Sequence, residues 1–175
     1  MIVHVHFTCA PDYNERRLPF RPAHLAQLTA LRAEGRVVAG GPEPDGSAAH
    51  IVYRVADLDE LERLLDDNVF QKAGLFAARH PRAFAEFLEP LEPPRLDAGV
   101  KCTLVEGTLL DRGLARARLA DLQREKRAAF GGFFADGGGL AVLITASADE
   151  AITWLCAAGG WDAASVRGRA WSQTL

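Results

Sequence analysis

Residues 24–28 read HLAQL, and residues 118–122 of the same 175-residue chain read RLADL. Downstream, an Asp-Gly pair at 45–46 precedes the apolar run HIVYRV, and a second Asp-Gly pair at 136–137 precedes AVLIT. The apolar positions that follow keep the same order and nearly the same spacing in both halves. Amphipathic segments can resemble one another by chance, but a repeat that keeps its order over this length favours one small fold used twice.

Each half predicts the order strand, helix, strand, strand, helix, strand. Residues 2–8 alternate apolar and polar side chains, which is typical of a half-buried strand. Pro22 suits the first turn of a helix, and Gly35 suits its end. In the first half we expect a strand at 2–8, a helix from Pro22 to the Gly35 stop, strands at 37–39 and 50–55, a helix after Asp57 and a strand within 75–87. In the second half we expect a strand at 101–108, a helix at 111–130, strands at 132–134 and 140–145, a helix at 148–157 and a strand at 165–171.

This order is the split βαβ, or ferredoxin-like, arrangement, which places both helices on one face of a four-stranded antiparallel sheet. The opposite face must also be covered, and two such sheets in one chain can cover each other. We therefore expect an α+β protein with one ferredoxin-like half at 1–90, a proline-rich linker at 91–99 and a second, degenerate half at 100–175. The halves would pack sheet-to-sheet as an intramolecular dimeric α+β barrel, either as a monomeric pseudo-dimer or as a homo-oligomer.

Composition narrows the classes of partner. A net charge of −3 provides no field to attract nucleic acid, and no apolar run approaches the length of a membrane span. The N-terminus reads as a strand and lacks the features of a secretion signal. Three widely spaced cysteines favour buried free thiols and a cytoplasmic location. His4 and His6 share one strand face, but two imidazoles do not make a zinc site, so we expect no metal.

The stretch RPAHLAQLTALRAEGRVVAGGP, residues 21–42, resembles the YciI-like (YCII-related) family of the dimeric α+β barrel superfamily. That family has a histidine on the first helix in an R-P-x-H-L-like context, a glycine before the second strand and an A-G-P-like turn after it. A later D-P-aromatic element followed by A-G corresponds here to residues 68–70 and 73–74. The resemblance covers about residues 1 to 88, and the second half matches only in pattern.

The resemblance implies that His24 is a proton-transfer residue, since the family is associated with a His–Asp pair. Alignment places Asn68 where the family has its aspartate, while Asp67 is one position away and is the alternative partner. The second half has Arg118 at the His24 position and Gly159 at the Asn68 position, so we expect one site per chain. The candidate catalytic residues are His24, Asp67 and Asn68, and the candidate substrate-binding residues are His6, Arg21, Gly41, Pro42 and Phe70.

Each assignment has a structural alternative. His24 could instead be a surface or helix-start histidine that lies off the apolar stripe of its helix and hydrogen-bonds to the backbone. Arg21 could instead be a surface charge. His6 lines either the cleft beside His24 or an exposed sheet face, and His50 and His80 are expected in solvent. The glycine runs at 40–41 and 137–139 are expected to be turns between strands.

Two functions follow from these readings. The first is an isomerase or lyase that acts on a small cyclic oxygenated substrate by His24-mediated proton transfer, without metal or organic cofactor. By the resemblance, the fold is shared with muconolactone isomerases and with dehydrochlorinases of aromatic degradation. The second is a non-catalytic module for small-ligand binding or assembly, in which the chemistry has decayed.

Overall fold

The computed structural model describes residues 1–91 and 100–174, which form two compact units. The first unit comprises Met1–Ala83 together with Thr174, and the second comprises Phe84–Gln173. The division falls inside a strand, before the predicted linker. Except for Leu91, that linker lies outside the described residues, so its position stays a prediction.

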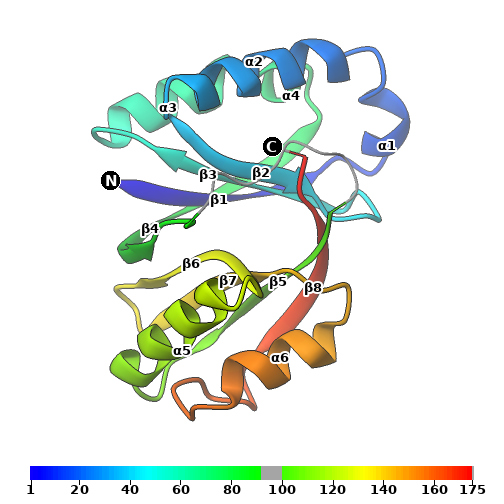
Figure 1. Ribbon diagram of the computed structural model, residues 1–175. Helices are drawn as coiled ribbons and strands as arrows, with labels where there is room; N and C mark the ends of the chain where they lie inside the picture. Colours follow the sequence, from blue (N-terminus) through cyan, green and yellow to red (C-terminus); the bar gives the residue numbers. More distant parts are fainter. Residues whose placement is uncertain (92–99, 175) are drawn as a thin grey trace. The chain divides into compact units, whose positions relative to one another are not determined.

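The first unit has the predicted order of four strands and two main helices, with two additional one-turn helices (Figure 1). Its strands pair antiparallel in the order β2-β3-β1-β4, which is the ferredoxin-like order. The helices α2, α3 and α4 lie on one face of this sheet. The elements are β1 (Ile2–Cys9), α1 (Tyr13–Arg16), α2 (Arg21–Ala33), β2 (Val37–Pro42), β3 (Ala48–Arg54), α3 (Leu58–Asp67), α4 (Val69–Lys72) and β4 (Phe76–Leu88).

The alternation of β1 determines which side chains enter the core of the first unit. Val3, Val5 and Phe7 are buried in the core cluster formed with the helices. Successive side chains of a strand point to opposite faces, so His4 and His6 lie on the face that the helices do not cover. The predicted half-buried strand is therefore confirmed, with its apolar positions on the helix side.

The helices of this unit begin and end at residues that suit those positions. The Asp57 side chain accepts a hydrogen bond from the Glu60 N–H and caps α3, while the Glu60 carboxylate accepts one from the Ala56 N–H. Asn68 caps α4 in the same way, accepting from the Phe70 and Gln71 N–H groups. The Asp57 cap thus fixes the start of α3, and the Asn68 cap fixes the turn between α3 and α4.

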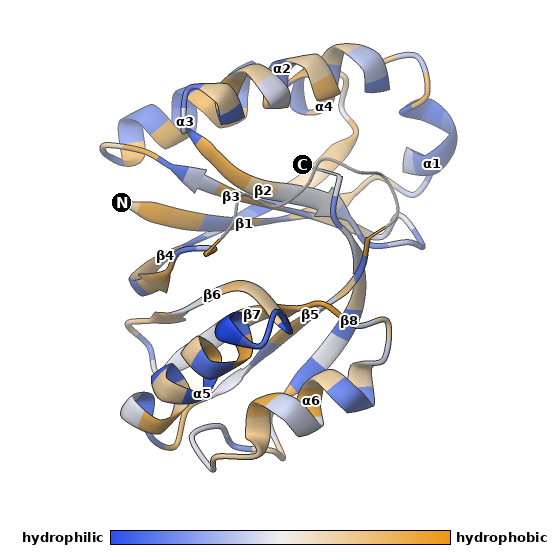
Figure 2. Cartoon of the chain, viewed as in Figure 1, coloured by the Kyte–Doolittle hydropathy of each residue, from blue (hydrophilic) through white to orange (hydrophobic). Residues whose placement is uncertain are grey.

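The polar segment before α2, predicted as a loop, contains the helix α1. This helix is hydrophilic (Figure 2), yet its Tyr13 side chain is only 3% exposed and joins the core. The Asn14 amide donates to the Asp45 carbonyl and the Arg16 guanidinium donates to the Ala73 carbonyl. The segment is thus anchored at several points.

The second unit repeats the plan of the first. Its strands pair antiparallel in the order β6-β7-β5-β8, with α5 and α6 on one face of the sheet (Figure 1). The last residues of β4, from Phe84 onward, pair with β6 in this unit, while Thr174 donates to the Gly40 carbonyl in the first. The elements are β5 (Lys101–Thr108), α5 (Arg112–Arg124), β6 (Ala128–Phe134), β7 (Gly138–Leu143), α6 (Ala148–Cys156) and β8 (Arg167–Ser172).

The α+β class with two ferredoxin-like halves is thereby confirmed. That the halves arose by tandem duplication, and that one sheet packs on the other, stay predictions. Cys9 and Cys102 are buried free thiols, as expected. No helix in the described part of the chain is long and apolar enough to cross a membrane.

Several predicted boundaries were wrong. The glycines at 137–139 were expected to form a turn, but β7 begins at Gly138, and the strand expected at 132–134 begins at Ala128. The helix expected at 111–130 ends at Arg124, because Lys126 adopts a left-handed conformation with φ 60° and the chain then enters β6. The strand expected at 37–39 continues to Pro42, since Gly40 and Gly41 pair with β3 and do not form a turn. Apolar residues in a row do not reveal whether a helix or a strand holds them.

Gly35 offers a test of the helix stop. It follows the last residue of α2 with φ 75°, and a Cβ added there would meet nothing within 4 Å, so only backbone strain opposes a side chain. We expect Gly35→Ala to destabilise the protein by about 1 kcal/mol in urea unfolding. The neighbouring exposed Glu34→Ala serves as control, with an expected change near zero. Equal midpoints for the two variants would contradict this account.

Candidate active site

His24 lies in the core of the first unit, on the apolar stripe of α2. Its side chain is 7% exposed, and its ring stacks on Phe70 with centroids 3.7 Å apart and planes 10° apart. Phe76 meets the imidazole edge-on at 6.4 Å. Leu28 and Leu31 continue the stripe at positions i+4 and i+7, so the prediction that His24 lies off the stripe was wrong.

The His24 imidazole is not satisfied by the protein. Its Nδ1 atom is buried and has no hydrogen-bond partner among the described residues. Burial, together with the smaller effect of the positive charge of Arg21, lowers the pKa of His24 to about 4. The ring is therefore neutral at neutral pH and able to accept a proton.

The predicted hydrogen bond between His24 and Asp67 or Asn68 is not formed. The Asp67 carboxylate is exposed and pairs with Lys72 at 2.8 Å, which lowers its pKa. Asn68 is buried and uses its side-chain oxygen to cap α4. Through this cap it positions Phe70, the residue on which His24 stacks, so its observed role is to hold the aromatic partner.

Asn68 also lies beside Tyr53, a second buried polar residue. Burial raises the pKa of the Tyr53 phenol, and the neighbouring Asn68 side chain opposes that rise. An asparagine at this position is thus surrounded by neutral groups, where an aspartate would have to be desolvated. Whether Asp67 or Asn68 takes part in catalysis stays a prediction.

The equivalent position in the second unit is occupied differently. Arg118 donates through Nε to the Trp154 carbonyl at 2.7 Å and pairs with Glu125 at 3.7 Å. Gly159, at the position of Asn68, has φ 73° and no side chain to cap a helix. The arginine is engaged in contacts within its own unit, in contrast to the unpartnered nitrogen of His24.

The other predicted ligand-binding residues are divided between two locations. Phe70 contacts His24 directly, and Arg21 acts on it electrostatically from the first turn of α2. His6 does not lie beside His24: it neighbours Phe7, whose ring stacks on Phe76 on the helix side of the sheet, and so faces the opposite way. Gly41 and Pro42 lie at the end of β2.

The face of the sheet away from the helices carries a row of histidines. His6 lies between His50 and His80 in the strand register, with ring centroids 5.0 and 5.6 Å away. His4 joins the row through a 3.0 Å contact between its Nε2 and Nδ1 of His50. His80 is exposed, as expected, but His50 is 1% exposed, so its predicted solvent position was wrong.

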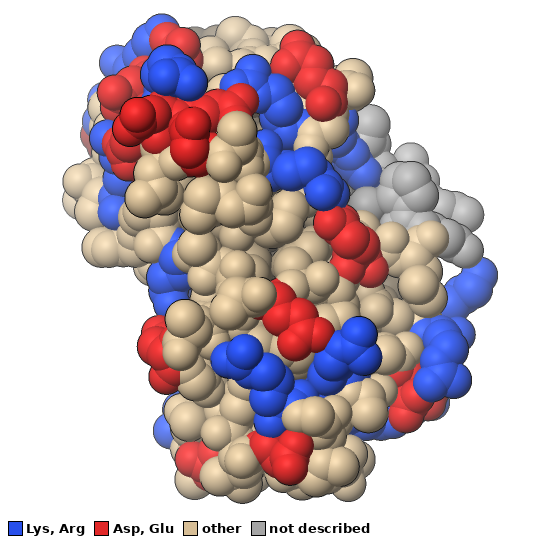
Figure 3. Space-filling model, turned by 90° about the vertical axis from the view of Figure 1, so that its left-hand side faces the viewer, with Lys and Arg blue, Asp and Glu red and all other residues tan. Residues whose placement is uncertain are grey.

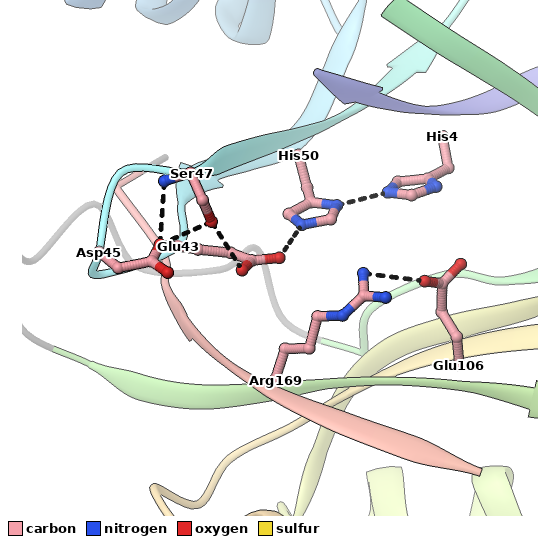
Figure 4. A network of polar contacts seen from close by, with 7 residues as sticks. All are labelled: His4, Glu43, Asp45, Ser47, His50, Glu106 and Arg169. Atoms are coloured by element: carbon pink, nitrogen blue, oxygen red, sulfur yellow. Dashed lines mark hydrogen bonds and ion pairs between the residues drawn. The ribbon is translucent and has the colours of Figure 1, made fainter. Parts of the chain in front are cut away.

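The His50 contact with Glu43 was missed from sequence. Its Nε2 lies 3.1 Å from the Glu43 carboxylate, and Ser47 links that carboxylate to Asp45 (Figure 4). When His50 is neutral and donates its Nε2 proton to the carboxylate, its Nδ1 is positioned to accept from His4 Nε2. The register that places Glu43 beside β3 depends on β2 continuing through its glycines, which the sequence did not predict.

Figure 4 also shows a separate ion pair of the second unit, between Arg169 and Glu106 at 3.6 Å. Within the described ranges 1–91 and 100–174, no group of three or more His, Cys, Asp or Glu side chains is placed to hold a metal ion.

Comparisons with known proteins place this geometry in a family. The YCII-related domain family matches residues 1–85. Protein YciI of Escherichia coli O6:H1 (strain CFT073) is 33% identical over 75 residues, an alignment that covers 37% of this chain and 76% of the E. coli protein.

The chain belongs to the YCII-related family.

Solved structures show that the fold extends beyond the YCII-related half. A monooxygenase-like protein from Lactobacillus acidophilus NCFM is 13% identical with a TM-score of 0.63, covering 99% of this chain and 93% of that one. A second, from Fusobacterium nucleatum subsp. nucleatum ATCC 25586, is 8% identical with a TM-score of 0.59, covering 99% and 92%. These neighbours have dimeric α+β barrel folds, and at such identities the likeness concerns the fold alone.

The depressed pKa of His24 predicts a pH-dependent stability. The unfolded chain binds a proton on this residue below about 6.5, whereas the folded chain does so only below about 4, so stability falls as the pH drops through that window. We expect the unfolding free energy of wild type, relative to His24→Gln, to fall by about 3 kcal/mol between pH 7 and pH 4.

The measurement is urea unfolding of both proteins at several pH values. Taking the difference in unfolding free energy between the two proteins cancels the contribution of the carboxylates, which titrate in the same pH range. A difference that does not change with pH would show that His24 is protonated as easily in the folded protein as in the unfolded chain.

Proposed function

We propose that the YCII-related unit is an enzyme that transfers a proton within a small cyclic oxygenated substrate, with His24 as the proton carrier. The observation that supports this most directly is the buried, unpartnered Nδ1 of a neutral imidazole. A buried polar atom without a partner costs free energy, and such costs are concentrated at functional sites.

In the proposed reaction, His24 Nδ1 accepts a proton from a carbon next to a carbonyl group of the substrate. The electrons of the broken C–H bond move into the carbonyl group and form an enolate. Return of the proton from Nδ1 to a different carbon completes an isomerisation. Alternatively, the enolate expels a leaving group, and the proton on Nδ1 passes to water. Both outcomes are redox-neutral.

The aromatic surroundings support a planar or cyclic substrate. Phe70 presents a face to His24, and Tyr13 meets Phe70 edge-on at 5.7 Å. Aromatic side chains with a few polar atoms are the usual lining of a small-molecule site. Asn68 keeps Phe70 in place and leaves the imidazole without a carboxylate partner, so His24 acts alone on this proposal.

The alternative is a non-catalytic ligand-binding or assembly module. It is favoured by the absence of a carboxylate contact to His24 and by Arg118 at the equivalent place in the second unit. On this reading the imidazole would only contribute a hydrogen bond to a bound ligand.

The test is proton exchange at the carbon atoms of a panel of lactones and catechol-like acids in D₂O, followed by ¹H NMR. We expect wild type to catalyse exchange or conversion of at least one compound. His24→Gln should reduce that rate by about 100-fold or more, the usual contribution of a general base.

His80→Gln is the matched control, because His80 is an exposed histidine on the opposite sheet face and should leave the rate unchanged. Equal rates for wild type and His24→Gln would refute the proposal. Binding of a compound without any exchange would instead favour the module.

A further inference from the structure

Arg17 lies in the turn between α1 and α2, although no sequence motif singled it out. The Arg17 N–H bonds to the Tyr13 carbonyl at 2.9 Å and the Arg21 N–H bonds to the Arg17 carbonyl at 2.8 Å. The turn therefore connects Tyr13 in α1 to Arg21 in the first turn of α2, which also carries His24.

The segment from Tyr13 to His24 carries the positive charges of Arg17 and Arg21 close to aromatic rings. The Arg17 guanidinium carbon lies 5.0 Å from the centroid of the Tyr13 ring. Burial raises the pKa of Tyr13, while a side-chain hydrogen bond with Arg17 and the charges of Arg17 and Arg21 act to lower it. Arg21 also acts on His24. The two arginines therefore lie within electrostatic range of the aromatic group that surrounds the imidazole.

Most charged side chains of this unit are paired in a different way. Arg16 pairs with Asp12 at 3.1 Å, and Arg79 pairs with Glu62 and Asp66, each at 2.7 Å. Figure 3 shows the same tendency at the surface, where acidic and basic side chains are interspersed on the face in view.

Arg17 and Arg21, by contrast, have no acidic partner within residues 1–91 and 100–174. Moreover, the Nε–H of Arg17 is buried and lacks any hydrogen-bond acceptor in the described structure. The Arg17 guanidinium lies over the Tyr13 ring, and the planar fork of a guanidinium can bind a carboxylate through two parallel hydrogen bonds.

We propose that Arg17, assisted by Arg21, binds a carboxylate or similar planar oxyanion of the substrate, and so makes the site specific for anionic cyclic compounds. The inference rests on the proposed function for the identity of the site, and it names the class of ligand that the site selects. The anion satisfies the Arg17 N–H and neutralises the local positive charge. The bound anion lies at the half-buried Arg17 and the exposed Arg21, next to the buried rings of Tyr13, Phe70 and His24.

The test uses benzoate and its neutral isostere benzamide as probes, with binding followed by NMR shifts of the His24 ring protons. Wild type should bind benzoate and move the His24 signals, and should bind benzamide at least about tenfold more weakly. Arg17→Gln should weaken benzoate binding by about tenfold or more and leave benzamide unaffected. Arg17→Lys, which keeps the charge without the planar fork, should give an intermediate loss.

Arg63→Gln is the matched control, since Arg63 is an exposed arginine on α3 and should leave both probes unaffected. Equal binding of the two probes to wild type, no binding of benzoate, or unchanged benzoate affinity in Arg17→Gln would each overturn the inference. Urea unfolding of the variants separates a lost contact from a lost fold.

These measurements distinguish a failure of the anion site from a failure of the proposed enzyme function. His24→Gln, in which binding is followed by backbone amide shifts, should still bind benzoate, because the anion contacts are made by the arginines. Arg17-dependent benzoate binding without proton exchange on any compound would support the anion site and refute the enzyme. Proton exchange that depends on His24 but not on Arg17 would support the enzyme and refute the anion site.

Discussion

The two-residue alternation of β1 is the constraint from which both polar features of the first unit follow. Burial of Val3, Val5 and Phe7 against the helices fixes which face of the sheet forms the core. A slip of one residue would bring the histidines of this strand into that core, at the cost of burying imidazoles among apolar groups. The apolar face therefore receives His24 from α2, while the histidine row with Glu43 is confined to the opposite face.

On the helix side of the sheet, the protonation state of His24 depends on how few polar groups surround it. Phe70 covers one face of the His24 ring, and Asn68 holds Phe70 by capping a four-residue helix too short to be stable alone. An aspartate in place of Asn68 would supply a charge but would itself need desolvation beside Tyr53. The observed arrangement keeps the buried groups beside His24 neutral, with the charge of Arg21 at the first turn of α2.

The fold could be predicted from the sequence because its signals are local. Alternation in β1, the Asp57 cap and the Gly35 stop each act within a few residues, and they specify the βαββαβ order without reference to distant contacts. The site was only partly predictable. His24 was found through its family motif. Three other features depend on side chains that only the fold brings together: the surroundings of the His24 Nδ1 atom, the cap formed by Asn68 and the burial of Tyr13. Lys126 was missed because a lysine rarely adopts a left-handed conformation.

The charges around His24 can be understood as one arrangement. Burial and the cation of Arg21 hold the imidazole in its neutral form, which preserves the lone pair but makes it a weak base. An aspartate at the position of Asn68, as the family resemblance implies for relatives, would oppose this effect with a permanent negative charge. No carboxylate of the described residues contacts His24, and a bound oxyanion would supply the charge instead, because an anion near Arg17 and Arg21 cancels the positive field and favours the imidazolium. The basicity of His24 would then rise only when a ligand of the correct charge is in place. Specificity and proton transfer would thus depend on the same electrostatic interaction.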